Sequence, residues 1–191
     1  MTDVPPADAL LSLDRRTVLH LGSGEKYDPA AVNVDIVSST NPDISHDLEI
    51  RPWPLPNDHF QEVRAFDVIE HLDDVVASME EIHRVCRNGA VVKITVPHYS
   101  CCNSFTDITH RHYFSIRSFD YFTGDNEFGF YTDRQYRKAR AEMVFFKSIV
   151  NKVVWRLAHR FPEEYERRWA WMFPAWFLYF ELIVIKPEHG T

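Results

Sequence analysis

Short apolar runs separated by turn-forming residues occupy the first hundred residues of the chain. Runs of this length that are rich in β-branched residues and end at Gly, Pro, Asn or Asp predict buried β-strands. Similar runs follow in the second half of the chain. The predicted strands cover residues 17–21, 32–37, 62–69, 90–96, 140–150 and 181–186.

Helical spacing of apolar residues is clearest over residues 73–87, which we predict to be a helix. Asp73 or Asp74 can cap its first turn, and Asn88 followed by Gly89 is typical of a left-handed stop. Strands that alternate with such a helix indicate an α/β fold with a mostly parallel sheet. The apolar face of the helix consists of Val75, Val76, Met79, Ile82, Val85 and Cys86.

Three other segments have a local signature. Residues 1–16 are expected to form a loosely held arm, with a short helix around its leucines. Asp28 and Pro29 are typical of a helix start, but the short link between the first two strands leaves room for a turn or two at most. Residues 155–180 are aromatic and mixed in charge, and we expect them to be helical.

Length and composition place the chain among single-domain globular proteins. It has 191 residues, of which 45% are hydrophobic and 26% charged. It contains no apolar run near the ~20 residues that a membrane-spanning helix needs. The N-terminus lacks the basic start of a secretory signal, and three cysteines do not make a disulfide framework. A cytoplasmic location is therefore expected.

The net charge of −7 is unevenly distributed. Residues 1–133 hold 10 Lys and Arg against 22 Asp and Glu, whereas residues 134–168 hold 10 against 4. The acidic part argues against a nucleic-acid partner, which would require a dominant basic face. The basic segment is either a solvated helical surface or a landing patch for an anionic substrate or membrane.

Candidate ligand-binding residues follow the first two predicted strands. Gly22 and Gly24 let the backbone approach a ligand closely, because a Cβ would collide there. Asp35 ends the second strand, and adjacent parallel strands place their carboxyl ends side by side. A carboxylate at that place can accept hydrogen bonds from both hydroxyls of a ribose. The alternatives are a plain tight turn and a surface aspartate.

Two further features refine this nucleoside hypothesis. Asp47 could accept a hydrogen bond from an adenine amino group while Leu48 packs against the ring, although a structural role for the pair remains open. Tyr27 stands where a dinucleotide fingerprint requires its third glycine. The absence of that glycine argues against the alternative hypothesis, a nicotinamide-dependent oxidoreductase.

The order of these motifs resembles the class I S-adenosylmethionine-dependent methyltransferases, in particular the small methyltransferase-11-like group with a Glu-His pair after the fourth strand. The resemblance covers residues 17–98 closely and the remainder in outline. Asp67 stands where relatives often carry His. The matching segments are residues 18–24, 34–36, 46–48, 66–72, 80–89 and 91–97.

The resemblance implies a Rossmann-like, doubly wound, seven-stranded sheet that is mostly parallel and has an antiparallel final strand. Residues 1–191 would form one methyltransferase domain, with residues 151–180 inserted between the last two strands. The implied cofactor is S-adenosylmethionine, with the glycines at its methionine and ribose parts. The implied cofactor residues are Gly22, Ser23, Gly24, Asp35, Ile36, Asp47, Leu48, Ala65, Phe66 and Asp67.

Histidines after the fifth predicted strand are the candidate catalytic residues. An imidazole near neutral pKa can take a proton from a hydroxyl or amine acceptor. His98, His110 and His112 are the candidates for this general base, and a structural role for each stays open. Glu70 and His71 follow the strand; His71 is expected to cap or brace the following helix, and a catalytic role for the pair stays open. We predict no metal site, because the nearby His and Cys residues match no standard zinc spacing.

The acceptor would be an oxygen or nitrogen atom of a small molecule, glycan or glycolipid. The tryptophans and arginines of residues 151–180 suit helices packed over the sheet, a lid over the acceptor, or a peripheral membrane contact. A non-catalytic module that binds S-adenosylmethionine is a further alternative. The oligomeric state stays open.

Overall fold

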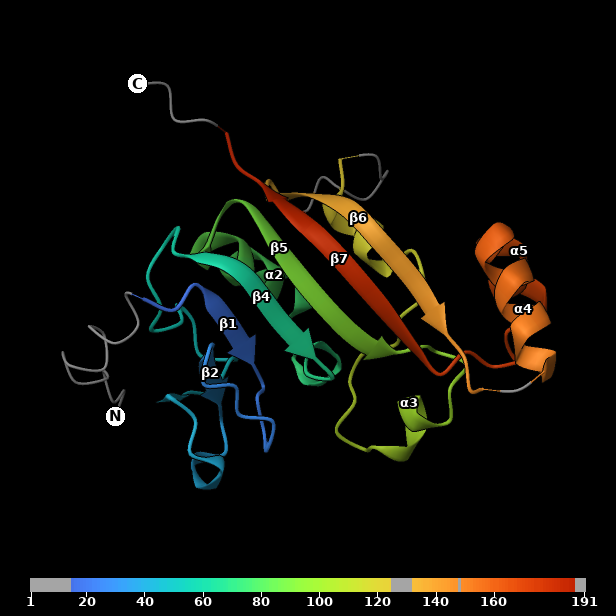
Figure 1. Ribbon diagram of the computed structural model, residues 1–191, viewed down its shortest axis with the longest axis horizontal. Helices are drawn as coiled ribbons and strands as arrows, with labels where there is room; N and C mark the ends of the chain where they lie inside the picture. Colours follow the sequence, from blue (N-terminus) through green and yellow to red (C-terminus); the bar gives the residue numbers. More distant parts are fainter. Residues whose placement is uncertain (1–14, 125–131, 148, 188–191) are drawn as a thin grey trace.

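A computed structural model describes residues 15–124, 132–147 and 149–187. The strands form a seven-stranded sheet in the order β3-β2-β1-β4-β5-β7-β6, and Figure 1 shows that this sheet is twisted. Strands β1 to β5 pair in parallel, and β7 runs antiparallel to both β5 and β6. The predicted α/β class, the mostly parallel sheet and the antiparallel final strand are therefore confirmed.

The strands are β1 (Val18–Leu21), β2 (Val32–Asp35), β3 (Ile44–Ser45), β4 (Phe60–Phe66), β5 (Cys86–Pro97), β6 (Gln135–Val144) and β7 (Phe177–Ile185). The α-helices are α2 (Val75–Val85), α3 (Asn103–Thr106), α4 (Ile149–Arg160) and α5 (Pro162–Arg168). Short 3-10 helices occur at η1 (Ser38–Thr40), η2 (Ile69–His71) and η3 (Ser118–Phe122).

The predicted helix starts as expected and ends differently. Asp74 caps α2 by accepting a hydrogen bond from the Ala77 N–H at 2.9 Å. The helix stops at Val85, because Cys86 takes an extended conformation and begins β5 by pairing with Phe60 of β4. Gly89 has a positive φ of 80°, but it lies inside β5 and does not end the helix. The predicted left-handed stop is therefore wrong.

The link between β1 and β2 contains turns and no helix. Asp28 closes a turn instead, with its carboxylate accepting from the Ala30 N–H and its carbonyl from the Ala31 N–H. The short helix expected in residues 1–16 falls mostly outside the described residues.

One face of the sheet is apolar and buried, and the opposite face carries charges. Successive strand residues point to opposite faces, so the buried Val92 and Ile94 of β5 alternate with Lys93. Lys93 and Arg64 both pair with Glu62, at 2.7 and 2.6 Å. These charged side chains are 21–30% exposed. On the charged face of the sheet, these ion pairs occupy the positions that packed apolar side chains occupy on the buried face.

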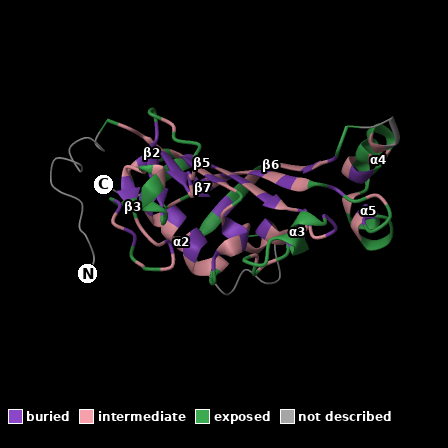
Figure 2. Ribbon diagram, turned by 90° about the horizontal axis from the view of Figure 1, so that it is seen from below, coloured by how far each residue is buried: buried purple, intermediate pink, exposed green. Residues whose placement is uncertain are grey.

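Helices α4 and α5 lie between β6 and β7 in the chain and project from one end of the sheet (Figure 1). Figure 2 shows their outer surfaces as largely exposed. The predicted helical stretch is thus correct in kind, but residues 177–180 belong to β7. Among the described residues, no helix has the length and apolar character needed to cross a membrane.

Helices α4 and α5 together form a helical arm. Glu166 of α5 connects this helical arm to the segment that follows β5. Its carboxylate accepts from the Ile116 N–H at 2.7 Å and lies 3.2 Å from the His98 Nε2. Its carbonyl accepts from the Tyr99 hydroxyl at 2.6 Å. The segment after β5 and helix α5 are therefore held together by three polar contacts.

Candidate functional site

The glycine turn after β1 lies directly against the end of β2. The Gly24 N–H donates to the Asp35 Oδ2 at 2.7 Å, and the Val37 N–H donates to Oδ1 at 2.8 Å. Gly22 and Gly24 have φ of 60° and 49°, a region that favours glycine. The strand-end pattern therefore predicted correctly that the glycines and Asp35 come together at one edge of the sheet.

Ser23, between the two glycines, is buried, and no described residue lies within hydrogen-bond distance of its hydroxyl. Beside it, a Cβ on Gly22 would lie 2.7 Å from the Val68 Cγ2. This close approach joins the glycine turn to the segment after β4. The cofactor residues predicted from β1 and from β4 are therefore neighbours.

Ile36, predicted as a cofactor residue, and Asp47 and Leu48, assigned to an adenine, lie in different environments. Ile36 follows Asp35 and is 64% exposed, which makes it an apolar side chain available to a ring. Asp47 accepts from the Glu49 N–H at 3.0 Å and so closes a local turn. Leu48 is buried in the core, and its carbonyl accepts from the indole N–H of Trp53. Burial of Leu48 favours packing over ring contact at this position.

The residues at the end of β4 also differ. Ala65 is completely buried in the core. Phe66 packs its ring edge-on against His20, with centroids 6.0 Å apart. Asp67 has a φ of 56°, and its carboxylate accepts from the Thr95 hydroxyl at 3.0 Å. Of the three, Asp67 lines the large cleft beside the glycine turn.

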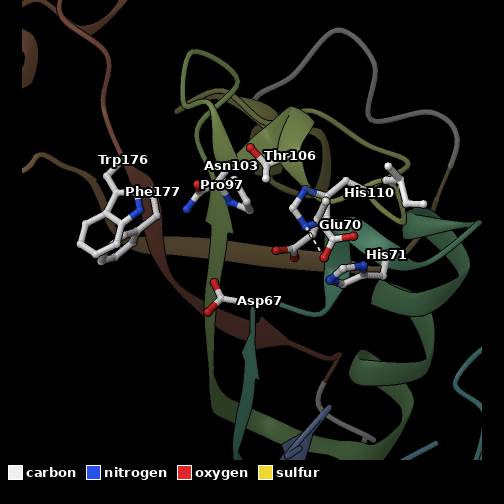
Figure 3. A pocket seen from close by; sticks show the side chains of 11 residues that line it. Asp67, Glu70, His71, Pro97, Asn103, Thr106, His110, Trp176 and Phe177 are labelled. Atoms are coloured by element: carbon white, nitrogen blue, oxygen red, sulfur yellow. Dashed lines mark ion pairs between the residues drawn. The ribbon is translucent and has the colours of Figure 1, made fainter.

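That cleft has a volume of about 750 Å³ and lies beyond the carboxyl ends of β4 and β5. Figure 3 shows Glu70, His71 and His110 gathered on one side, with Trp176 and Phe177 across from them. Asp67 and Pro97 lie between the two sides. The cleft thus has one wall of titratable groups and one aromatic wall.

The three predicted catalytic histidines are not equivalent. His98 is completely buried, with its Nδ1 bonded to the Ser100 hydroxyl and its Nε2 facing Glu166. The Nε2 of His112 lies 3.2 Å from the Asp73 carbonyl, outside the cleft lining. Only His110 of the three lines the cleft. Both nitrogens of His98 are engaged, so its contacts favour a structural role.

Glu70, which is absent from the predicted catalytic and cofactor residues, lies in the same wall. Its side chain is 1% exposed, and neither carboxylate oxygen has a hydrogen-bond partner among the described residues. Burial raises the pKa of Glu70 to about 8; its own backbone N–H acts in the opposite direction, and the charges of Asp67 and Asp107 add to the rise. A buried group without partners is costly, so this carboxyl needs a proton or a cation.

The imidazole rings of His71 and His110 lie against each other beside Glu70. Their ring centroids are 4.7 Å apart, and burial together with the His110 charge lowers the pKa of His71. Backbone hydrogen bonds hold the two segments together, because the Glu70 carbonyl accepts from the Arg111 N–H at 2.8 Å. Arg111 also forms an ion pair with Asp73. One ligand atom each of Glu70, His71 and His110 lies within 4.8 Å of the others.

Sequence comparisons find no known family and no characterised relative. No family model matches the chain. No curated protein matches it either.

Solved structures, in contrast, share its fold. An S-adenosylmethionine-dependent methyltransferase from Mesorhizobium loti is 13% identical, with a TM-score of 0.58 over 92% of this chain and 96% of its own. The 16S rRNA (adenine(1408)-N(1))-methyltransferase from Catenulisporales acidiphilia is 14% identical, with a TM-score of 0.58 over 100% and 96%. The [4+2]-cyclase SpnF is 11% identical, with a TM-score of 0.56 over 94% and 81%.

The cyclase illustrates that one fold supports more than one chemistry, so fold likeness alone does not assign an activity. Strand order, the antiparallel β7 and these matches agree on the architecture. The chain therefore has the fold of the class I S-adenosylmethionine-dependent methyltransferases.

Proposed function

We propose that the protein is a methyltransferase that binds S-adenosylmethionine at the glycine turn and an acceptor in the adjoining cleft. The observation that carries the proposal is the 2.7 Å contact between the Gly24 N–H and the Asp35 carboxylate. It places a bare backbone and a buried acid at the carboxyl edge of the sheet, where α/β folds bind nucleosides.

The residues at this edge fit such a cofactor. The Asp35 carboxylate retains lone pairs that can accept from ribose hydroxyls, in addition to its two backbone contacts. The buried Ser23 hydroxyl is available to a ligand atom, and the exposed Ile36 offers a surface for the adenine ring. Asp47 would receive the adenine amino group. Asp67, at the junction with the cleft, would face the methionine end.

The chemistry is a displacement in line with the sulfur–methyl bond, for which the cofactor supplies the methyl group on a positively charged sulfur. The protein contributes alignment and exclusion of water, and orientation of this kind supplies roughly 7–11 kcal/mol in favourable cases. Asp67 lines the cleft and comes directly before Val68, whose side chain approaches Gly22, so the cleft would adjoin the reacting end of the cofactor.

We infer that the acceptor is an oxygen or nitrogen atom of a small molecule, glycan or glycolipid. His110, in the cleft wall, is the imidazole placed to assist removal of the acceptor proton. The cleft is lined by the carboxyl groups of Asp67, Glu70 and Asp107. Such a lining disfavours a polyphosphate backbone, which supports an acceptor other than nucleic acid.

The helical arm supports a second part of the proposal, contact with an anionic lipid surface. Trp155, Leu157 and Phe161 of the α4–α5 region are 45–57% exposed, and Trp169 and Trp171 are 50% and 68% exposed. A groove of about 700 Å³ between the two helices is lined almost entirely by apolar side chains. Basic residues interleave with these aromatics, as in interfacial helices.

Calorimetry with S-adenosylmethionine and with NAD, followed by turnover assays for S-adenosylhomocysteine, tests the proposal. We expect binding of S-adenosylmethionine and no binding of NAD. Turnover with hydroxyl-bearing or amine-bearing acceptors would distinguish an enzyme from a non-catalytic binding module. Binding of NAD alone, or of neither compound, would overturn the assignment.

A further inference from the structure

We propose that Glu70, His71 and His110 bind a divalent transition-metal cation in the acceptor cleft. One carboxylate and two imidazoles are the ligand set of catalytic zinc sites and of non-haem iron sites. Their candidate ligand atoms all lie within 4.8 Å of one another. Because the mixed nitrogen and oxygen donors suit borderline cations, Zn²⁺, Mn²⁺, Co²⁺ and Fe²⁺ fit better than Ca²⁺.

The burial of Glu70 is an independent observation that points to the same ligand. Its side chain is 1% exposed, and both carboxylate oxygens lack a hydrogen-bond partner among the described residues. A purely structural acid at this position would be expected to accept hydrogen bonds from neighbouring donors. Figure 3 shows Glu70 next to the two histidines, so its oxygens have a place in the cluster.

The hydrogen bonds of both histidines are made on the Nδ1 side, and the Nε2 of His110 faces the Asp107 Oδ2 at 3.9 Å, beyond hydrogen-bond distance. The Nδ1 of His110 lies 3.4 Å from the Ser104 carbonyl, which can only accept, so this nitrogen carries the proton. The Nδ1 of His71 lies 2.8 Å from the Thr109 hydroxyl. That hydroxyl already donates to Asp107 at 2.7 Å, so it accepts from His71. Metal-binding histidines commonly have their second nitrogen held in this manner.

Backbone contacts bring the three ligands together from segments about 40 residues apart. The Glu70 carbonyl accepts from the Arg111 N–H at 2.8 Å, next to His110. The pairing of Arg111 with Asp73 adds a second connection between the segments. The site is thus held by the protein before any cation binds, which lowers the ordering cost of coordination.

Three protein ligands leave coordination positions open toward the cleft. An acceptor that presents a hydroxyl or carboxylate oxygen would occupy them, which selects oxygen-donor acceptors over purely apolar ones. This selection of acceptors rests on the proposed methyl transfer, whereas cation binding itself does not. In the loaded site His110 would act on the acceptor through the cation and would not take its proton directly.

The test is calorimetric titration of the chelator-treated full chain with Zn²⁺ and Mn²⁺, without S-adenosylmethionine. We expect one cation per chain, and visible absorption bands when Co²⁺ is used. Glu70→Gln and His110→Gln should each weaken binding by at least about 100-fold, and Thr109→Val, which removes the hydroxyl that contacts both His71 and Asp107, by about tenfold. His112→Gln is the matched control and should bind as the wild type does.

Thermal unfolding of each variant verifies that it folds, and the Thr109→Val result stands if a ligand variant does not. Absence of one-to-one binding by the wild type, or unchanged binding by Glu70→Gln and His110→Gln, overturns the site. A separate titration with S-adenosylmethionine distinguishes the two proposals. Cation binding without cofactor binding would refute only the methyltransferase, and the reverse result only the cation site.

Discussion

The Cβ of any residue that replaced Gly22 would lie 2.7 Å from the Cγ2 of Val68. Gly22 also has a φ of 60°, which adds backbone strain for an L side chain. We expect Gly22→Ala to lower the free energy of unfolding by about 2–4 kcal/mol, measured by urea denaturation. Gly24→Ala, with a φ of 49° and open space around its Cβ, should cost only about 1–2 kcal/mol.

A double-mutant cycle should show that Val68→Ala recovers part of the Gly22→Ala loss. Additive effects would contradict the contact.

Asp35→Ala should weaken the binding of S-adenosylmethionine at least about tenfold. The carboxylate is expected to accept from the ribose, and a hydrogen bond to a charged group contributes about 1.5–3 kcal/mol. Calorimetry measures the change, and circular dichroism verifies the fold, since the same carboxylate holds the Gly24 and Val37 amides. A folded variant with wild-type affinity would remove Asp35 from the cofactor site.

His110 and His98 should respond in opposite ways to the same substitution. His110→Gln should lower turnover by at least about tenfold with little change in cofactor affinity, because His110 lines the cleft. His98→Gln should instead lower the free energy of unfolding by about 1–3 kcal/mol, because it disturbs the buried contacts with Ser100 and Glu166. Turnover and urea denaturation of both variants give the comparison. The reverse pattern would assign the catalytic role to His98.

The helical arm should bind vesicles that contain anionic lipid, and binding should fall as salt is added. Trp155→Ala should reduce the partition coefficient about tenfold, because burial of a large apolar side chain contributes about 1.5–3 kcal/mol. Ile50→Ser, which changes another exposed apolar residue, is the control. Co-sedimentation with vesicles measures the binding. Equal binding to neutral vesicles, or no effect of Trp155→Ala, would argue against an anionic lipid partner.

His83 should make the protein less stable in mild acid. Burial lowers the pKa of this imidazole, as do the charges of Lys186 and Arg134, while Asp58 acts in the opposite direction. The unfolded chain therefore binds a proton that the folded chain resists once the pH falls below about 6.5. The contribution of His83 to the free energy of unfolding should therefore decrease from pH 7 to pH 5, whereas Glu70, with its raised pKa, contributes in the opposite direction.

His83→Gln should make that decrease smaller, since glutamine does not titrate and can still donate to the Ile185 carbonyl that His83 contacts at 3.0 Å. Denaturation curves at several pH values measure the difference. An unchanged slope in the variant would show that His83 does not contribute to the pH dependence.

The parts of the fold that follow from local sequence were predicted well. Buried strands next to glycine or aspartate are defined by their own residues, and the parallel-sheet rule then brings Gly24 and Asp35 together. The end of α2 was missed, because Val85 and Cys86 suit a helix and a strand equally. Pairing of Cys86 with Phe60 in β4 decides the matter, and that contact is not local.

Strand β6 was predicted too late in the chain for a related reason. Its first half, beginning at Gln135, is charged and exposed, so it lacks the apolar alternation of a strand. Its position is determined by pairing with β7, as in Gln135 opposite Ile185. Of the residues that the sequence suggested as strand, 145–147 lie outside β6, 148 lies outside the described residues, and 149–150 belong to α4.

The cleft wall shows what a sequence motif leaves out. Glu70 and His71 are adjacent in the sequence and were noted as a pair. Backbone hydrogen bonds bring His110 next to them, and these bonds cannot be predicted from the pattern of side chains. The metal hypothesis weighed and set aside from sequence used His98, Cys101, Cys102, His110 and His112, of which His110 alone lines the cleft. Spacing along the chain did not connect His110 with Glu70 and His71.

The three contacts of Glu166 have a mechanical consequence. They bind α5 to the segment that begins at His98, and Pro97, one residue earlier, lines the cleft. Insertion of the tryptophans of the helical arm into a bilayer would therefore act on a segment that directly follows a residue of the cleft lining. Membrane docking of the helical arm would then be coupled to access to the cleft.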